Sequence, residues 1–161
     1  MKLKTSKPFW QVIGLGIVAG MRTASAPAIA GHILSRHPSG HLSKSYLDFM
    51  QSDKVAIVLK VLAAGEFITD KLPSTPNRTK PVGIASRCLS GSLVGASIYK
   101  ADGNDAYKGA LLGAALALAS TFASYYLRKI TVDKLHIFDP LAGAFEDALV
   151  IGAGAGLICS D

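Results

Sequence analysis

Six charged residues lie inside otherwise apolar stretches of the sequence, where an isolated charge is expensive. The six are Arg22, Glu66, Asp70, Arg87, Glu146 and Asp147. At the centre of a membrane helix, each such charge costs about 2.5–3.5 kcal/mol on insertion scales, so each requires a partner or water. Four carboxylates against two arginines leave excess negative charge unless a cation binds or protons are held. The set therefore predicts a site for a cation, a proton or a small polar solute.

Position along the apolar stretches predicts which charges meet. At about 1.5 Å per residue, Glu66 and Glu146 reach a similar depth from the same membrane face, and Arg87 enters from that face too. Asp70 lies one helical turn from Glu66 and continues the acidic stripe. We expect these carboxylates and the adjacent Asp147 to be compensated by Arg87. The alternative is an ion-pair network that only fixes helix register, because buried ionic groups are weak evidence for stabilisation.

Arg22 and Pro27 predict an interruption deeper in the first apolar stretch. The proline removes a backbone hydrogen bond, and small residues surround it from Thr23 to Pro27. A broken helix at membrane depth is tolerated only where it is buried in protein or lines a cavity, and many transporters build their sites in this way. We therefore expect a helix break at Pro27 beside the charged cluster.

Composition predicts the elements that position these residues. Hydrophobic residues make up 50% of the 161 residues and charged residues 17%, against about 25% charged in soluble domains. A membrane helix needs about 20 apolar residues, and five segments approach that length. They are residues 9–34, 55–72, 82–99, 106–127 and 140–159. The expected fold is all-α, a polytopic transmembrane helical bundle forming a single membrane domain over residues 1–161.

Four features refine this bundle. Glycines recur four residues apart, as in Gly91 with Gly95 and Gly109 with Gly113, which predicts closely packed helix pairs. The segments 62–66 and 142–146 can be aligned, which would make the chain an inverted repeat. The third segment is short and contains Arg87, so it is expected to be tilted, interrupted or shielded from lipid. Residues 35–54 are either a short interfacial amphipathic helix or a plain surface loop.

The basic residues predict orientation and exclude one class of partner. Lys and Arg are scattered between the apolar segments and form no long basic run, so the net charge of +6 does not indicate nucleic-acid binding. Their distribution over the expected loops favours a cytoplasmic N-terminus in the inner (plasma) membrane of a bacterium. The expected partners are the lipid bilayer and a second copy of the chain, because five short helices enclose little volume alone.

No enzyme motif is visible, so we do not expect catalysis or a cofactor. The sequence has no zincin helix, P-loop or nucleophile elbow, and no haem, flavin or nucleotide signature. The four histidines lie in connecting segments. Three of them, His32, His37 and His41, either hold a surface metal ion or are ordinary exposed side chains, and such spacing in a polar loop favours the second interpretation.

Several of these residues together resemble a known family. The segments 16–27, 65–73 and 145–147, with Arg87 and Gly91, are similar to bacterial membrane proteins grouped as domain of unknown function 4126. The resemblance spans nearly the whole chain, and the order of its motifs is fairly specific. It implies membrane placement and the same candidate positions, and it implies no substrate.

Two functions remain open from the sequence. The first is a transporter or channel that uses the intramembrane acidic cluster. The second is a non-transporting membrane scaffold that recruits a partner through residues 32–54. The first requires that Glu66, Arg87, Glu146 and Asp147 converge beside a cavity accessible to water.

Overall fold

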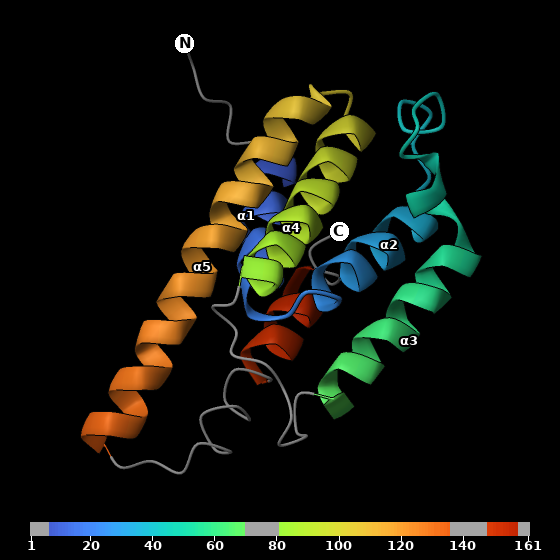
Figure 1. Ribbon diagram of the computed structural model, residues 1–161. Coiled ribbons are helices and arrows are strands. Elements are labelled where there is room, and N and C mark those ends of the chain that lie inside the picture. The colour runs from blue at the N-terminus through green and yellow to red at the C-terminus, as the bar shows by residue number, and fades with distance from the viewer. Residues whose placement is uncertain (1–6, 70–80, 136–147, 158–161) are drawn as a thin grey trace.

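The computed structural model describes residues 7–69, 81–135 and 148–157, which are helical with short connections (Figure 1). The elements in order are α1 (Lys7–Met21), α2 (Ser25–Arg36), the 3-10 helix η1 (Asp48–Gln51), α3 (Asp53–Thr69), α4 (Pro81–Ala101) and α5 (Ala106–Leu135). A further helix, Ala148–Leu157, follows. The described residues contain no strand, so the all-α prediction is confirmed for them.

The first two helices form a hairpin, where the sequence predicted one long interrupted span over residues 9–34. Helix α1 ends at Met21, and α2 runs back toward the level at which α1 begins, so that Pro8 and Leu34 line the same pocket. The interruption also differs from the prediction in position. It lies at residues 22–24, and Pro27 is in the first turn of α2, where a missing amide donor is tolerated.

The hairpin gives the bundle two distinct ends. At the loop end, α1, α3 and α5 begin and α2 and α4 end. At the break end, the α1–α2 connection meets the last turn of α3 and the first turns of α4 (Figure 1). The start of α1 and the segment 37–52 therefore share one end. The single span predicted over residues 9–34 would have placed them at opposite ends, and the hairpin corrects that prediction.

The segment 37–52 is a set of turns ending in η1, without the amphipathic α-helix that was one of its two predicted forms. Ser39 fixes it in two directions. The Ser39 amide donates to the side-chain oxygen of Gln51, and the Ser39 hydroxyl donates to the carbonyl of Ala101 at the end of α4. Tyr46 and Phe49 are exposed on its outer side.

Helices α4 and α5 pack backbone against backbone through the predicted glycine pairs. A methyl group on Gly95 would collide with the Gly109 carbonyl, and one on Gly91 would collide with the Gly113 carbonyl. On another side, α5 packs against α1, where a methyl group on Gly20 would meet Ser120. Small residues thus allow the close approach that packing requires when lipid supplies no hydrophobic drive between helices.

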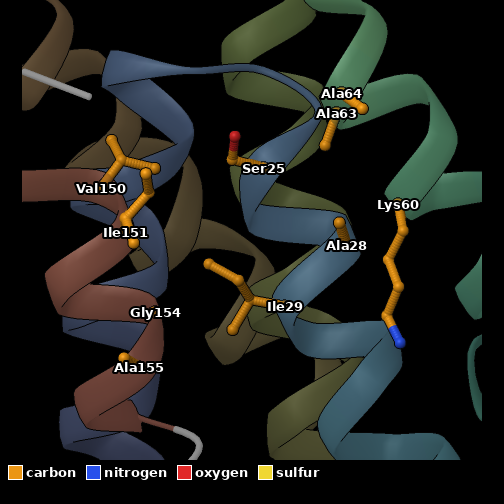
Figure 2. Close-up of a pocket in the computed structure, with 10 residues that line it drawn as sticks. All are labelled: Ser25, Ala28, Ile29, Lys60, Ala63, Ala64, Val150, Ile151, Gly154 and Ala155. Carbon is orange, nitrogen blue, oxygen red and sulfur yellow. The ribbon is translucent and has the colours of Figure 1, made fainter. Parts of the chain in front are cut away.

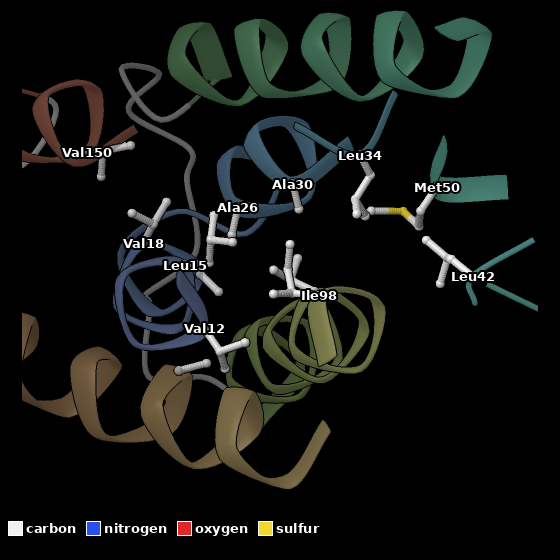
Figure 3. Packing of buried hydrophobic residues seen from close by; sticks show 13 residues of the cluster. Val12, Leu15, Val18, Ala26, Ala30, Leu34, Leu42, Met50, Ile98 and Val150 are labelled. Atoms are coloured by element: carbon white, nitrogen blue, oxygen red, sulfur yellow. The ribbon is translucent and has the colours of Figure 1, made fainter. Parts of the chain in front are cut away.

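The buried apolar side chains join α1 to its neighbours (Figure 3). Val12, Leu15 and Val18 of α1 pack in one cluster with Ala26 and Ala30 of α2, and the cluster extends to α4 and to the segment 37–52. This core fixes the hairpin against α4 and so holds residues 22–24 in place.

One described helix is long and apolar enough to cross a membrane by length and composition, namely Ala106–Leu127 within α5. Pro8–Met21 and Ala148–Leu157 are shorter apolar helices. Helix α3 has 17 residues and is shorter than such a helix. The five-span bundle is therefore not confirmed. Of the predicted fifth segment, residues 140–147 and 158–159 lie outside the described residues, as does the second half of the proposed repeat.

Candidate functional site

Glu66 binds the backbone of the helix break. Its two carboxylate oxygens accept hydrogen bonds from the amides of Thr23 (2.8 Å) and Ala24 (2.7 Å). Ala24 is the N-cap of α2 and makes no side-chain capping bond, and the carboxylate from α3 binds its amide and the amide before it, which precede those that a usual cap binds. The first amides of a helix lack intrahelical partners and carry partial positive charge, which an anion stabilises.

Hydroxyl groups from α4 and α5 bind the carbonyls on the other side of the break. The Thr121 hydroxyl lies 3.1 Å from the Gly20 carbonyl and 2.7 Å from the Ala117 carbonyl of its own helix, so its one proton is shared between them. The Ser120 hydroxyl likewise lies 3.1 Å from the Ile17 carbonyl and 3.3 Å from that of Ala117. Ser90 of α4 donates to the carbonyl of Thr23 itself (2.6 Å). Polar backbone groups at a helix break must find partners within the protein if water is excluded. Glu66 and these three hydroxyls supply such partners.

Two buried arginines flank the break. Arg22 is 3% exposed and Arg87 is 7% exposed. Arg22 Nη1 approaches the backbone carbonyl of Glu66 at 3.4 Å, and its own amide continues α1 by bonding to Val18. Counted along their helices from the loop end, Arg22, Glu66 and Arg87 all lie roughly 20 Å deep. The sequence placed Arg22 deeper than the acidic cluster, and the structure brings it to the level of Glu66.

Only some of the predicted site residues lie in the described part of the chain. The structure brings Glu66, Arg22 and the first turn of α2 together, with Arg87 one turn before Ser90 on α4. Asp70, Glu146 and Asp147 lie outside the described residues. Sequence reasoning missed Ser90, Ser120 and Thr121, because a hydroxyl in an apolar helix carries no charge to mark it. Their burial is the property that identifies them.

A groove of about 470 Å³ begins beside the break (Figure 2). Its floor is α2, with Ser25, Ala28 and Ile29, and its walls are α3 and the helix Ala148–Leu157. Ser25 is 4% exposed, and its hydroxyl oxygen has no hydrogen-bond partner in the part of the chain that the structure describes. The other lining residues are apolar except Lys60.

A cationic cluster lies at the end of this groove away from Ser25. Lys60 of α3 donates to His32 Nδ1 of α2 at 3.0 Å, and Arg36 follows one turn later on α2. Burial lowers the pKa of His32 from its usual value, and the positive charges of Lys60 and Arg36 lower it further. A neutral imidazole is the form that accepts the hydrogen bond of an ammonium group.

The described residues contain no group of three or more His, Cys, Asp or Glu side chains placed to hold a metal ion. Each carboxylate oxygen of Glu66 accepts one backbone hydrogen bond and keeps a second lone pair.

Comparison with known proteins gives one match. The sequence profile of a family described as "Domain of unknown function (DUF4126)" matches residues 10–157. No curated protein and no solved structure gives a significant match.

Proposed function

The chain belongs to the family of domain of unknown function 4126, and we propose that it is a small polytopic membrane transporter whose coupling group is the Glu66 carboxylate. One observation carries the proposal: a carboxylate from α3 binds both amides of a helix break that lies about 20 Å from the loop end of the bundle. The transported species is a proton, alone or with a cation or small polar solute.

Protonation of Glu66 would be coupled to the position of α3 relative to the start of α2. A protonated carboxyl group loses its negative charge and one acceptor site, so it binds the two amides less well. The hold of α3 on the start of α2 then weakens, while the hydroxyls of Ser90 and Thr121 still bind the neighbouring carbonyls. Broken helices in transporters place their partial charges beside the transported group in a similar way.

The membrane setting is part of the proposal. Large apolar side chains are exposed on α3, on α5 and on the helix Ala148–Leu157, as expected of surfaces that face lipid or a second copy. We propose that α3, α4 and α5 cross the bilayer and that the α1–α2 hairpin enters it from the loop end. The proposed location is a bacterial inner membrane with the N-terminus in the cytoplasm, and the proposed assembly is a homodimer.

Proton flux into reconstituted vesicles tests this function. Vesicles containing the wild-type protein and a trapped pH-sensitive dye are expected to dissipate an imposed proton gradient faster than empty vesicles. Glu66→Gln should reduce the protein-dependent rate at least tenfold, because the amide side chain cannot take up a proton. Asp53→Asn, which removes an exposed carboxylate from the start of the same helix, should leave the rate unchanged. Equal rates for wild type and Glu66→Gln would contradict the proposal.

The exposure of Tyr46 and Phe49 favours a second candidate, a scaffold that recruits a partner through the segment 37–52. Replacing both residues by serine distinguishes the two functions. The transporter proposal predicts unchanged proton flux in this variant. The scaffold proposal predicts the loss of a crosslinked partner in cells and no protein-dependent flux even in the wild type.

A further inference from the structure

We propose that the groove between α3 and the helix Ala148–Leu157 binds one anionic phospholipid, with its phosphate at the loop end and an acyl chain over α2. This inference rests on the membrane placement proposed above and not on transport. It assigns a ligand to a surface distinct from the helix break, although the two meet at Ser25.

The lining of the groove suits an acyl chain. The residues along it are small or aliphatic, including Ala28, Ala63 and Ala64, so the side chains leave an open channel of about 470 Å³. That volume lies within the range of about 300–1,000 Å³ typical of small-molecule sites. Figure 2 shows α2 as the floor between the two walls, so a linear chain would lie along the helix.

The charge at one end of the groove suits a phosphate group. Figure 2 shows the Lys60 side chain extending away from the Ser25 end, and its ammonium reaches His32 Nδ1. The charged neighbours that act on His32 are Lys60 and Arg36, and both are positive. Long lysine side chains extend along apolar surface toward the membrane interface, and basic pockets between membrane helices bind anionic headgroups.

The two properties together select one class of lipid. A zwitterionic headgroup carries a cation beside its phosphate and so compensates the positive cluster less than an anionic headgroup does, and a soluble anion would leave the apolar channel empty. A second copy of the chain could cover the apolar walls, but it would have to bring an acidic group to Lys60 and Arg36. The combination of channel and cationic end therefore favours an anionic phospholipid of the surrounding bilayer.

Native mass spectrometry of the detergent-solubilised protein tests this site. The protein is titrated with phosphatidylglycerol or with phosphatidylcholine of the same acyl chains, and bound lipid is counted. We expect one saturable phosphatidylglycerol per chain and markedly weaker binding of phosphatidylcholine. Lys60→Gln should weaken phosphatidylglycerol binding about fivefold, the factor expected for one basic residue near an anionic surface. Lys108→Gln, at the same end of the bundle on α5, should leave the affinity unchanged.

A second pair of variants separates the channel from the charge. Ala64→Phe places an aromatic ring in the groove from an exposed position on α3 and should prevent retention of the lipid. Val61→Phe adds a ring to the same helix outside the groove and should leave binding unchanged. Equal binding of the two lipids, or full binding by Ala64→Phe, would overturn the proposal. So would a wild-type dimer that binds no lipid and that Ala64→Phe dissociates.

Different results would contradict the lipid proposal and the transporter proposal. Selective phosphatidylglycerol binding with no proton flux would contradict only the transporter. Proton flux that depends on Glu66, together with equal binding of both lipids, would contradict only the lipid site. The Lys60→Gln variant keeps Glu66 and its amide partners, so its proton flux should remain within twofold of wild type when reconstituted without anionic lipid.

Discussion

The two sides of the helix break are packed in different ways. On one side, α1, α4 and α5 approach each other through glycines that cannot accept even a methyl group. On the other, α2, α3 and the helix Ala148–Leu157 leave a groove. A methyl group added at Gly152 or Gly156 would meet none of the described residues within 4 Å, and one added at Gly154 would meet only the Ile29 side chain among them. The comparison indicates that α1, α4 and α5 form a tightly packed group, whereas α2, α3 and the helix Ala148–Leu157 are packed more openly. Glu66 joins the two groups at residues 22–24. Four substitutions test this difference.

The largest expected effect is on the tightly packed side. Gly95→Val places two methyl groups against the backbone of Gly109, where neither helix can move without disturbing the other glycine pair. Overpacking of this kind typically costs about 1–3 kcal/mol, and we expect a value at or above the upper limit because the obstacle is backbone. Thermal unfolding in detergent, followed by circular dichroism, measures it. A melting temperature close to that of wild type would show that α4 and α5 are not in close contact.

The second largest effect is expected at Glu66, whose contact with residues 22–24 joins the two sides. Glu66→Gln retains one acceptor oxygen and loses the charge, so one charge-assisted bond to the amides of Thr23 and Ala24 is lost. Such a bond contributes about 1.5–3 kcal/mol, and we expect a loss of unfolding free energy of that order. Asp53→Asn on the same helix should change stability by less than about 0.5 kcal/mol. A Glu66→Gln protein as stable as the Asp53→Asn protein would indicate that the carboxylate does not hold the break.

A smaller effect is expected at the carbonyl of the same break. Ser90→Ala removes the hydrogen bond to the Thr23 carbonyl and should cost about 1 kcal/mol. Ser86→Ala is the matched control, since the Ser86 hydroxyl donates to Gly83 within its own helix. If both variants lose the same stability, the contact between α4 and the break contributes nothing of its own.

The smallest effect, with the opposite sign, is expected on the open side. Gly152→Ala adds a methyl group where no atom of the described part of the chain lies within 4 Å, and alanine is favoured over glycine in a helix by about 0.5–1 kcal/mol. The variant should therefore be slightly more stable than wild type in the same unfolding measurement. Destabilisation by more than about 1 kcal/mol would mean that this face is covered, which a second copy of the chain would explain.

Much of the helical pattern could be predicted from the sequence, because apolar length and prolines mark helix limits. The segments expected at 82–99 and 106–127 correspond to α4 and to most of α5, and the glycine pairs between them are in contact. The hairpin could not be predicted in this way. An interrupted apolar stretch has the same composition whether the chain continues across the bundle or turns back, and the choice depends on packing against α4.

The residue types of the site were predicted from the sequence, and two of its backbone contacts were not. A charge in an apolar helix drew attention to Glu66, whose carboxylate accepts hydrogen bonds from the amides of Thr23 and Ala24. Backbone amides at a helix start stabilise an anion, and nothing in the sequence distinguishes them from any other amides. The hydroxyls of Ser90 and Thr121 were missed because their role appears only once residues 22–24 are known to lack helical partners.

Hydrogen–deuterium exchange at the amides of Thr23 and Ala24, measured in lipid nanodiscs, tests the central claim most directly. If Glu66 holds the break, these amides exchange slowly in the wild-type protein and at least tenfold faster in Glu66→Gln, since each 1.4 kcal/mol lost corresponds to a factor of ten. Asp53→Asn should match the wild type. Equal exchange rates at these two amides in wild type and Glu66→Gln would contradict the account.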